Sequence, residues 1–171
     1  MLFRSMAEAI PALTTEKAIK LYEKFKIFTK AELESRSEVL YETYSKTINI
    51  EAHTMTGMAS KQIVPAVMSY AKSLADTVNS MKAAGIEPEV PLKMLKLVNE
   101  NLCEMQDALE KMKDARKAAV SISNQKERAL CYMRTVVPAM KALREPADRL
   151  EKIVNKKYWP FPTYADLMFE V

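Results

Sequence analysis

The fold is decided by residues 95–112, which read LKLVNENLCEMQDALEKM. Apolar side chains recur in this stretch at alternating steps of three and four residues: Leu95, Val98, Leu102, Met105, Leu109 and Met112. That spacing places them on one stripe of an α-helix, as in the seam of a coiled coil. The stretch therefore predicts a helix that packs lengthwise against other helices.

A longer helical pattern precedes this seam. Thr29 followed by Glu32 is a capping box, which predicts a helix that begins directly after the threonine. Apolar residues then recur, mostly at steps of three or four, as far as Ala84. Gly85 is the expected C-terminal cap. A short helix is expected upstream of the capping box.

A further helical pattern follows the seam, after the polar break SISNQ. Ser123 or Asn124 can cap this helix, and its apolar stripe runs to Val154. Pro138 and Pro146 lie inside the stripe. Because proline lacks a backbone donor, we expect Pro146 to kink the helix or divide it in two.

Together the patterns predict an all-α protein with three long helices and a short N-terminal helix. Short connections favour long antiparallel hairpins, which would form a bundle over residues 29–158. The segment IVPAVM at 63–68 is echoed by VVPAM at 136–140. Counting along the hairpins puts Pro65 and Pro138 at about the same level, so we expect matched kinks; chance recurrence is the alternative.

The last thirteen residues, WPFPTYADLMFEV at 159–171, end the helical pattern and hold the only tryptophan. Pro160 and Pro162 favour extended backbone, so we expect an extended aromatic tail that lies on an apolar surface. The candidate structural or interface residues are these aromatic side chains and the two helical prolines: Pro65, Pro138, Trp159, Phe161, Tyr164 and Phe169.

Composition gives no candidate for catalysis, cofactor binding or metal binding. His53 is the only histidine, and the two cysteines and two glycines form neither a zinc motif nor a phosphate-binding loop. Cys103 and Cys131 are expected roughly 18 Å apart along the hairpins, so we predict free thiols. We therefore predict no catalytic, cofactor or metal residue in this chain.

Charge and hydropathy exclude other classes. The net charge is +4, but basic residues are interleaved with acidic ones and not clustered, which argues against a nucleic-acid-binding face. No apolar stretch approaches the length of a membrane span and no secretory signal follows the start, so we expect a cytoplasmic protein. We expect residues 1–5 to be non-native, left over from sequence assembly. The alternative is that they are the native start.

Several segments are similar to one family: TKAELESR at 29–36, KTINIEAHTM at 46–55, MASKQIVPA at 58–66, VVPAM at 136–140, REPADRLE at 144–151 and WPFPTYADLMF at 159–169. They resemble the C-terminal region of type III glutamine synthetases, over nearly everything after Met6. Residues 6–28 resemble the end of the catalytic domain's last helix and a short connecting helix.

The resemblance implies a parent enzyme that joins ammonia to glutamate with ATP and a divalent metal, expected to be Mg²⁺, in a large ring-shaped oligomer. No catalytic residue of that family maps onto this chain, so the chain alone is expected to be inactive. The implied partners are the catalytic core of the same polypeptide and neighbouring subunits of a homo-oligomer. A stand-alone helical protein–protein interaction module is the alternative interpretation.

Overall fold

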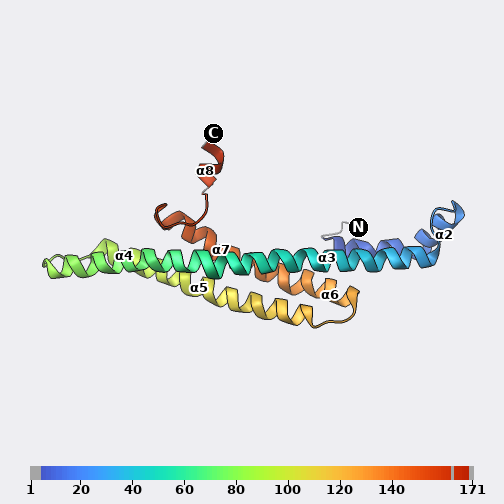
Figure 1. The fold of residues 1–171 in the computed structure, drawn as a ribbon, viewed down its shortest axis with the longest axis horizontal. Helices are drawn as coiled ribbons and strands as arrows, with labels where there is room; N and C mark the ends of the chain where they lie inside the picture. The colour runs from blue at the N-terminus through green and yellow to red at the C-terminus, as the bar shows by residue number, and fades with distance from the viewer. Residues whose placement is uncertain (1–4, 163, 170–171) are drawn as a thin grey trace. The chain divides into compact units, whose positions relative to one another are not determined.

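A computed structural model describes residues 5–162 and 164–169, with the side chains of Tyr164, Ala165 and Phe169 outside the description. The described residues are helical and contain no strand, which confirms the all-α prediction (Figure 1). The elements are α1 (Met6–Ala9), the 3₁₀ segment η1 (Ile10–Thr14), α2 (Glu16–Lys24), α3 (Lys30–Met58), the π-helical turn η2 (Ala59–Ile63), α4 (Val64–Ala83), α5 (Glu89–Val120), α6 (Gln125–Cys131), the π-helical turn η3 (Tyr132–Val136), α7 (Val137–Ile153) and α8 (Tyr164–Phe169).

The chain forms two compact units, each built from two separate stretches of sequence. Unit 1 comprises Met1–His53 and Lys113–Ala139, and unit 2 comprises Thr54–Met112 and Met140–Val171. The two longest α-helices, α3 and α5, each contribute residues to both units. Each unit is described separately below.

Local capping fixes where the helices begin, as predicted. At the start of α3, the Glu32 carboxylate accepts hydrogen bonds from the Thr29 backbone N–H at 2.7 Å and from its hydroxyl at 2.8 Å. These bonds hold the pKa of Glu32 below its ordinary value. Asn124 caps α6 by accepting the Glu127 N–H at 3.0 Å, and Thr15 caps α2.

The end of α4 is also as predicted. Gly85 has a φ of +76°, in the left-handed region that glycine adopts without steric cost. Its N–H bonds the Lys82 carbonyl at 3.0 Å, and the Ile86 N–H bonds the Met81 carbonyl at 2.9 Å. This pattern is a Schellman motif, which satisfies the last carbonyls of the helix.

The two Val-Pro-Ala echoes fold alike. Val64 and Val137 each donate a hydrogen bond to the carbonyl five residues earlier, on Ala59 and Tyr132 respectively. The proline that follows each valine has no N–H, and its ring would crowd the carbonyl four residues back in a regular helix. The π-helical turn opens the helix at that point. Kinks matched in level between Pro65 and Pro138 remain a prediction.

Two details of the C-terminal third differ from expectation. Helix α7 is not divided at Pro146, because Leu143, Pro146 and Leu150 form one buried stripe; a kink at Pro146 remains a prediction. Burying each leucine contributes roughly 1.5–3 kcal/mol, enough to offset the interior proline. The tail, residues 159–171, is not extended throughout, since α8 occupies Tyr164–Phe169, beyond Pro162, where no further proline opposes a helix.

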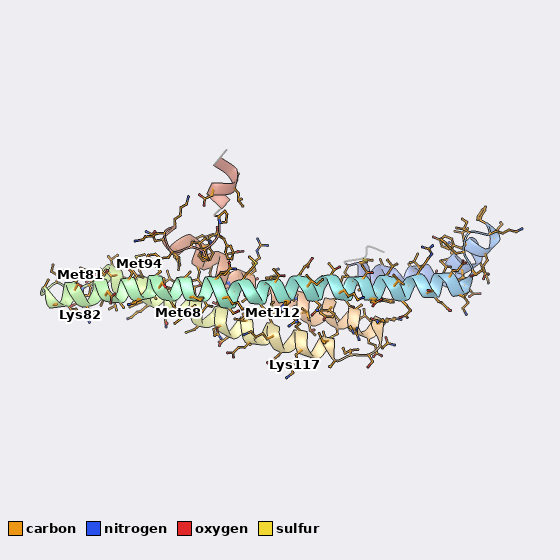
Figure 2. All side chains as sticks on the ribbon, viewed as in Figure 1. Met68, Met81, Lys82, Met94, Met112 and Lys117 are labelled. Carbon is orange, nitrogen blue, oxygen red and sulfur yellow. The ribbon has the colours of Figure 1, made fainter. Side chains whose placement is uncertain are left out.

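Each unit has its own apolar core. In unit 1, Ala7 and Ile10 pack with Tyr41 of α3 and Ala129 of α6. Unit 2 buries the seam of α5 at Val98, Met105, Leu109 and Met112, with Leu95 and Leu102 half-buried. Methionines serve both core and surface: Met112 is fully buried, whereas Met68 is largely exposed (Figure 2).

Candidate interaction surfaces

An apolar groove of about 320 Å³ lies on unit 2. Its walls come from the end of α3, η2, α5, α7, the segment after α7 and α8. The lining residues are Met55, Met58, Ala59, Ile63, Met105, Leu143, Arg144, Ala147, Asp148, Glu151, Trp159, Phe161, Pro162 and Leu167. Trp159 and Phe161 of the tail thus line a groove together with helices of the same unit, and the packing of the whole tail on an apolar surface remains a prediction.

The segment after α7 is held in place by several contacts. The Tyr158 ring lies 5.6 Å from the Tyr70 ring of α4, tilted by 50°, a favourable geometry for aromatic pairs. The Trp159 backbone N–H donates to the Asn155 and Lys156 carbonyls at 3.3 and 3.2 Å. Lys156 also forms an ion pair with Asp166 of α8. These contacts hold the turn at 155–158, from which Trp159 reaches the groove.

Helices α5 and α7 are joined beside the groove by Arg149. Its guanidinium donates to the Asn101 side-chain oxygen at 2.7 Å and forms an ion pair with Glu104. Asn101 is 7% exposed, and its amide nitrogen donates to the Leu97 carbonyl at 2.8 Å. Because a buried amide oxygen without a partner is costly, Arg149 fixes how α7 lies on α5.

The structure brings only some of the sequence candidates together. Trp159 and Phe161 are half-buried and line the apolar groove. Pro65 lies exposed on α4 in unit 2, and Pro138 lies exposed on α7 in unit 1. The backbones of Tyr164 and Phe169 belong to α8. Their side chains lie outside the described residues, so their predicted roles stay predictions.

A polar groove of about 650 Å³ lies on unit 1, lined by Pro11, Thr14, Glu16, Ile19, Lys20, Glu23, Lys30, Glu34, Ser37, Glu38, Tyr41 and Lys126. Ser37 is 6% exposed and its hydroxyl has no hydrogen-bond partner. Burial raises the pKa of the neighbouring Tyr41, and Glu38 adds to the shift. The sequence did not lead us to predict this groove. Its one signal there is Ser37, a polar residue on the apolar stripe of α3.

The described side chains offer no metal centre. Within residues 5–162 and 164–169, no three or more histidine, cysteine, aspartate or glutamate side chains gather as metal ligands. His53 is exposed, not partly buried as a lone histidine usually is. Cys103 and Cys131 are free thiols, as predicted. No helix in the described part of the chain is long and apolar enough to span a membrane.

Comparison with known proteins identifies the family. A family model described as the glutamine synthetase C-terminal domain matches residues 1–82, and similarity to two glutamine synthetases covers 96% and 98% of the chain. The chain belongs to the glutamine synthetase C-terminal domain family. The resemblance predicted from the segments of α3, α7 and the tail is thereby confirmed.

The relatives of this glutamine synthetase domain are much longer proteins. The chain is 32% identical over 171 residues to the type-3 glutamine synthetase of Dictyostelium discoideum. The matched region covers 96% of the chain and 23% of that protein. It is 32% identical over 170 residues to the glutamine synthetase of Butyrivibrio fibrisolvens, covering 98% and 24%. For the Bacteroides fragilis (strain YCH46) glutamine synthetase the identity is 31% over 150 residues, covering 84% and 21%. The chain spans about a quarter of the length of these curated relatives.

Proposed function

We propose that this chain is a non-catalytic helical region of a glutamine synthetase and serves packing or oligomer assembly in the parent enzyme. The observation that carries the proposal is the apolar groove on unit 2, where Trp159 and Phe161 meet residues of α3, α5 and α7. A groove walled by methionine, leucine and aromatic side chains binds by burying apolar surface. Its polar residues lie on α7 and do not surround a reacting centre.

The parent activity would be ATP-dependent joining of ammonia to glutamate, in the cytoplasm, with a divalent metal such as Mg²⁺. The described residues of this chain do not fit either group. Their carboxylates do not gather as a cation site, and neither glycine belongs to a phosphate-binding loop. We therefore assign ATP and metal binding to other parts of the parent.

The packing role suits the connections between helices. We propose that the long helices form antiparallel hairpins, because the connection at 84–88 is short and the left-handed Gly85 ends α4 there. A braced helical hairpin presents a long surface at little entropic cost. Such a surface is suited to contact a catalytic core or a neighbouring subunit.

Glutamine formation tests the division of labour. The isolated 171-residue chain and the full-length parent are each assayed with ATP, Mg²⁺, glutamate and ammonium. We expect activity from the parent and none from the isolated chain, because its described carboxylates do not gather as a cation site. Turnover by the isolated chain above a heat-denatured control would refute the non-catalytic assignment.

The alternative is a stand-alone interaction module. Its supporting observation is that each unit has a buried apolar core of its own. The coding sequence upstream of this chain separates the two proposals. A synthetase core in the same reading frame supports the first, and its absence supports the module.

A further inference from the structure

The polar groove of unit 1 contains a buried hydroxyl that the fold does not use. Ser37 lines this groove and is 6% exposed, and its Oγ has no hydrogen-bond partner within the described residues. A buried hydroxyl left unpaired costs stability, so native structures rarely keep one. Beside a groove, such a hydroxyl indicates a group that a bound molecule can satisfy.

The hydroxyl of Ser37 differs from others on the same helix. A helical serine or threonine can donate to the carbonyl four residues earlier. Ser45 of α3 does so, to the Tyr41 carbonyl at 2.9 Å, and Thr43 makes the same kind of bond at 2.8 Å. Ser37 makes no such bond to Leu33. Its Oγ is therefore available to a molecule in the groove.

The charged side chains of the groove pair only in part. Glu16 forms an ion pair with Lys20 at 2.6 Å. Lys30 forms one with Glu34 at 3.7 Å. The other charged groups of the lining form no ion pair within the described part of the chain, and they lie on α2, α3 and α6, respectively: the carboxylates of Glu23 and Glu38 and the ammonium of Lys126. Three helices of unit 1 thus bring two free negative charges and one free positive charge to one groove.

Tyr41 adds a second hydroxyl to the groove. It packs in the core of unit 1 with Ile10 and Ala129, and it also lines the groove. Burial and the Glu38 carboxylate raise the pKa of Tyr41, so its hydroxyl stays protonated and can donate a hydrogen bond. Because Ser37 and Tyr41 are four residues apart on α3, they lie on one face of the helix. That face is anchored in the core, so its polar contacts are preformed.

We propose that this groove binds a free diamino acid, a small molecule with two ammonium groups and one carboxylate. The ammonium groups match the carboxylates of Glu23 and Glu38, and the carboxylate matches the ammonium of Lys126. An ammonium has three donors, so the one at Glu38 also donates to Ser37 Oγ. The groove volume of about 650 Å³ suits a small molecule. The site shares no residue with the apolar groove of unit 2 and goes beyond the proposed packing role.

Calorimetric titration of the 171-residue chain with L-lysine tests the site. We expect a Kd of about 1 mM or tighter, for a ligand of this size with several charged contacts. Two analogues, 1,5-diaminopentane without the carboxylate and L-norleucine without the second ammonium, should each bind about tenfold more weakly. No binding of L-lysine at about 10 mM, or equal binding of both analogues, would overturn the proposal.

Two serine variants locate the binding site. Ser37→Ala should weaken L-lysine binding about tenfold, yet raise Tm without ligand, because it removes a buried hydroxyl that has no partner. Ser45→Ala is the matched control: this serine is 3% exposed on the same helix but does not line the groove, so L-lysine binding should not change. Unchanged binding in Ser37→Ala would overturn the proposal. So would a lower Tm of ligand-free Ser37→Ala, since the hydroxyl would then serve the fold.

Charge variants test the proposed match of groups. Glu38→Gln should weaken L-lysine binding about tenfold, because one ammonium loses its carboxylate. Lys126→Met should weaken binding of L-lysine but not of 1,5-diaminopentane, which has no carboxylate to lose. Equal weakening of both ligands by Lys126→Met would contradict the match. The titrations involve neither ATP nor glutamine formation, so their failure would leave the proposed function intact.

Discussion

Replacing each of the two glycines by alanine is expected to change the stability of unit 2 in opposite directions. Gly57 lies inside α3, and a Cβ added there would meet nothing within 4 Å. Alanine is about 0.8–1.0 kcal/mol more favourable than glycine in a helix interior. Gly57→Ala should therefore raise the free energy of unfolding by nearly that amount.

At Gly85 the same substitution meets open space but a φ of +76°. A left-handed residue with a Cβ costs about 1–2 kcal/mol, partly offset by about 0.4–1 kcal/mol from the stiffer unfolded chain. Gly85→Ala should therefore lower the free energy of unfolding by about 1 kcal/mol. The two variants should move Tm about 2–4 °C in opposite directions.

Denaturant titration of the isolated chain measures both effects. Far-ultraviolet circular dichroism follows all helices, and the fluorescence of Trp159 reports on unit 2, which contains both glycines. A destabilising Gly57→Ala would show that another backbone approaches α3 closely at this position. A neutral Gly85→Ala would show that the Schellman motif does not set the end of α4.

Four further substitutions test separate contacts. Arg149→Met should cost about 1–3 kcal/mol in denaturant titration, because it leaves the buried Asn101 oxygen without its donor; no loss would mean that water replaces the contact. Lys26→Gly should raise Tm, because it relieves about 1 kcal/mol of strain from the left-handed backbone after α2. A fall in Tm would show that the Lys26 side chain stabilises the end of α2. Glu32→Gln should lower the free energy of unfolding at neutral pH. Because folding lowers the pKa of Glu32, the stabilisation by its carboxylate is complete above the ordinary pKa of 4.5 and is lost as pH falls through the folded-state pKa. The unfolding curves of the variant and the unsubstituted chain should therefore converge in acid. Trp159→Ala should cost about 1–3 kcal/mol, less than a fully buried tryptophan, because Trp159 is half-buried; an unchanged Tm would place its packing partner outside this chain.

Local signals in the sequence predicted the helix boundaries well. The starts of α3 and α6 and the end of α4 each depend on one residue next to the boundary: the capping side chains of Thr29 and Asn124, and the left-handed backbone of Gly85. The seam of α5 was readable because burial repeats with the helical period. Both kinds of signal are contained in short stretches of chain, so no tertiary information was required.

Features that depend on distant residues were harder to predict. The path of α7 through Pro146 depends on the buried stripe around it, which outweighs the local preference of proline. The only sequence signal of the π-helical turns was the repeated Val-Pro-Ala at 64–66 and 137–139. That repeat predicted kinks but not the wider helical turn. Trp159 and Phe161 stood out as anomalies of composition. Their partners in the groove, such as Met105 and Leu143, looked like ordinary core residues.

The assembly role is tested most directly by the mass of the parent glutamine synthetase in sedimentation velocity, with and without residues 159–171. We predict that truncation after Tyr158 opens the groove, lowers the mass of the assembly and leaves each subunit folded by circular dichroism. A truncated parent with the mass and stability of the full-length protein would contradict the proposal that this helical region serves packing or assembly.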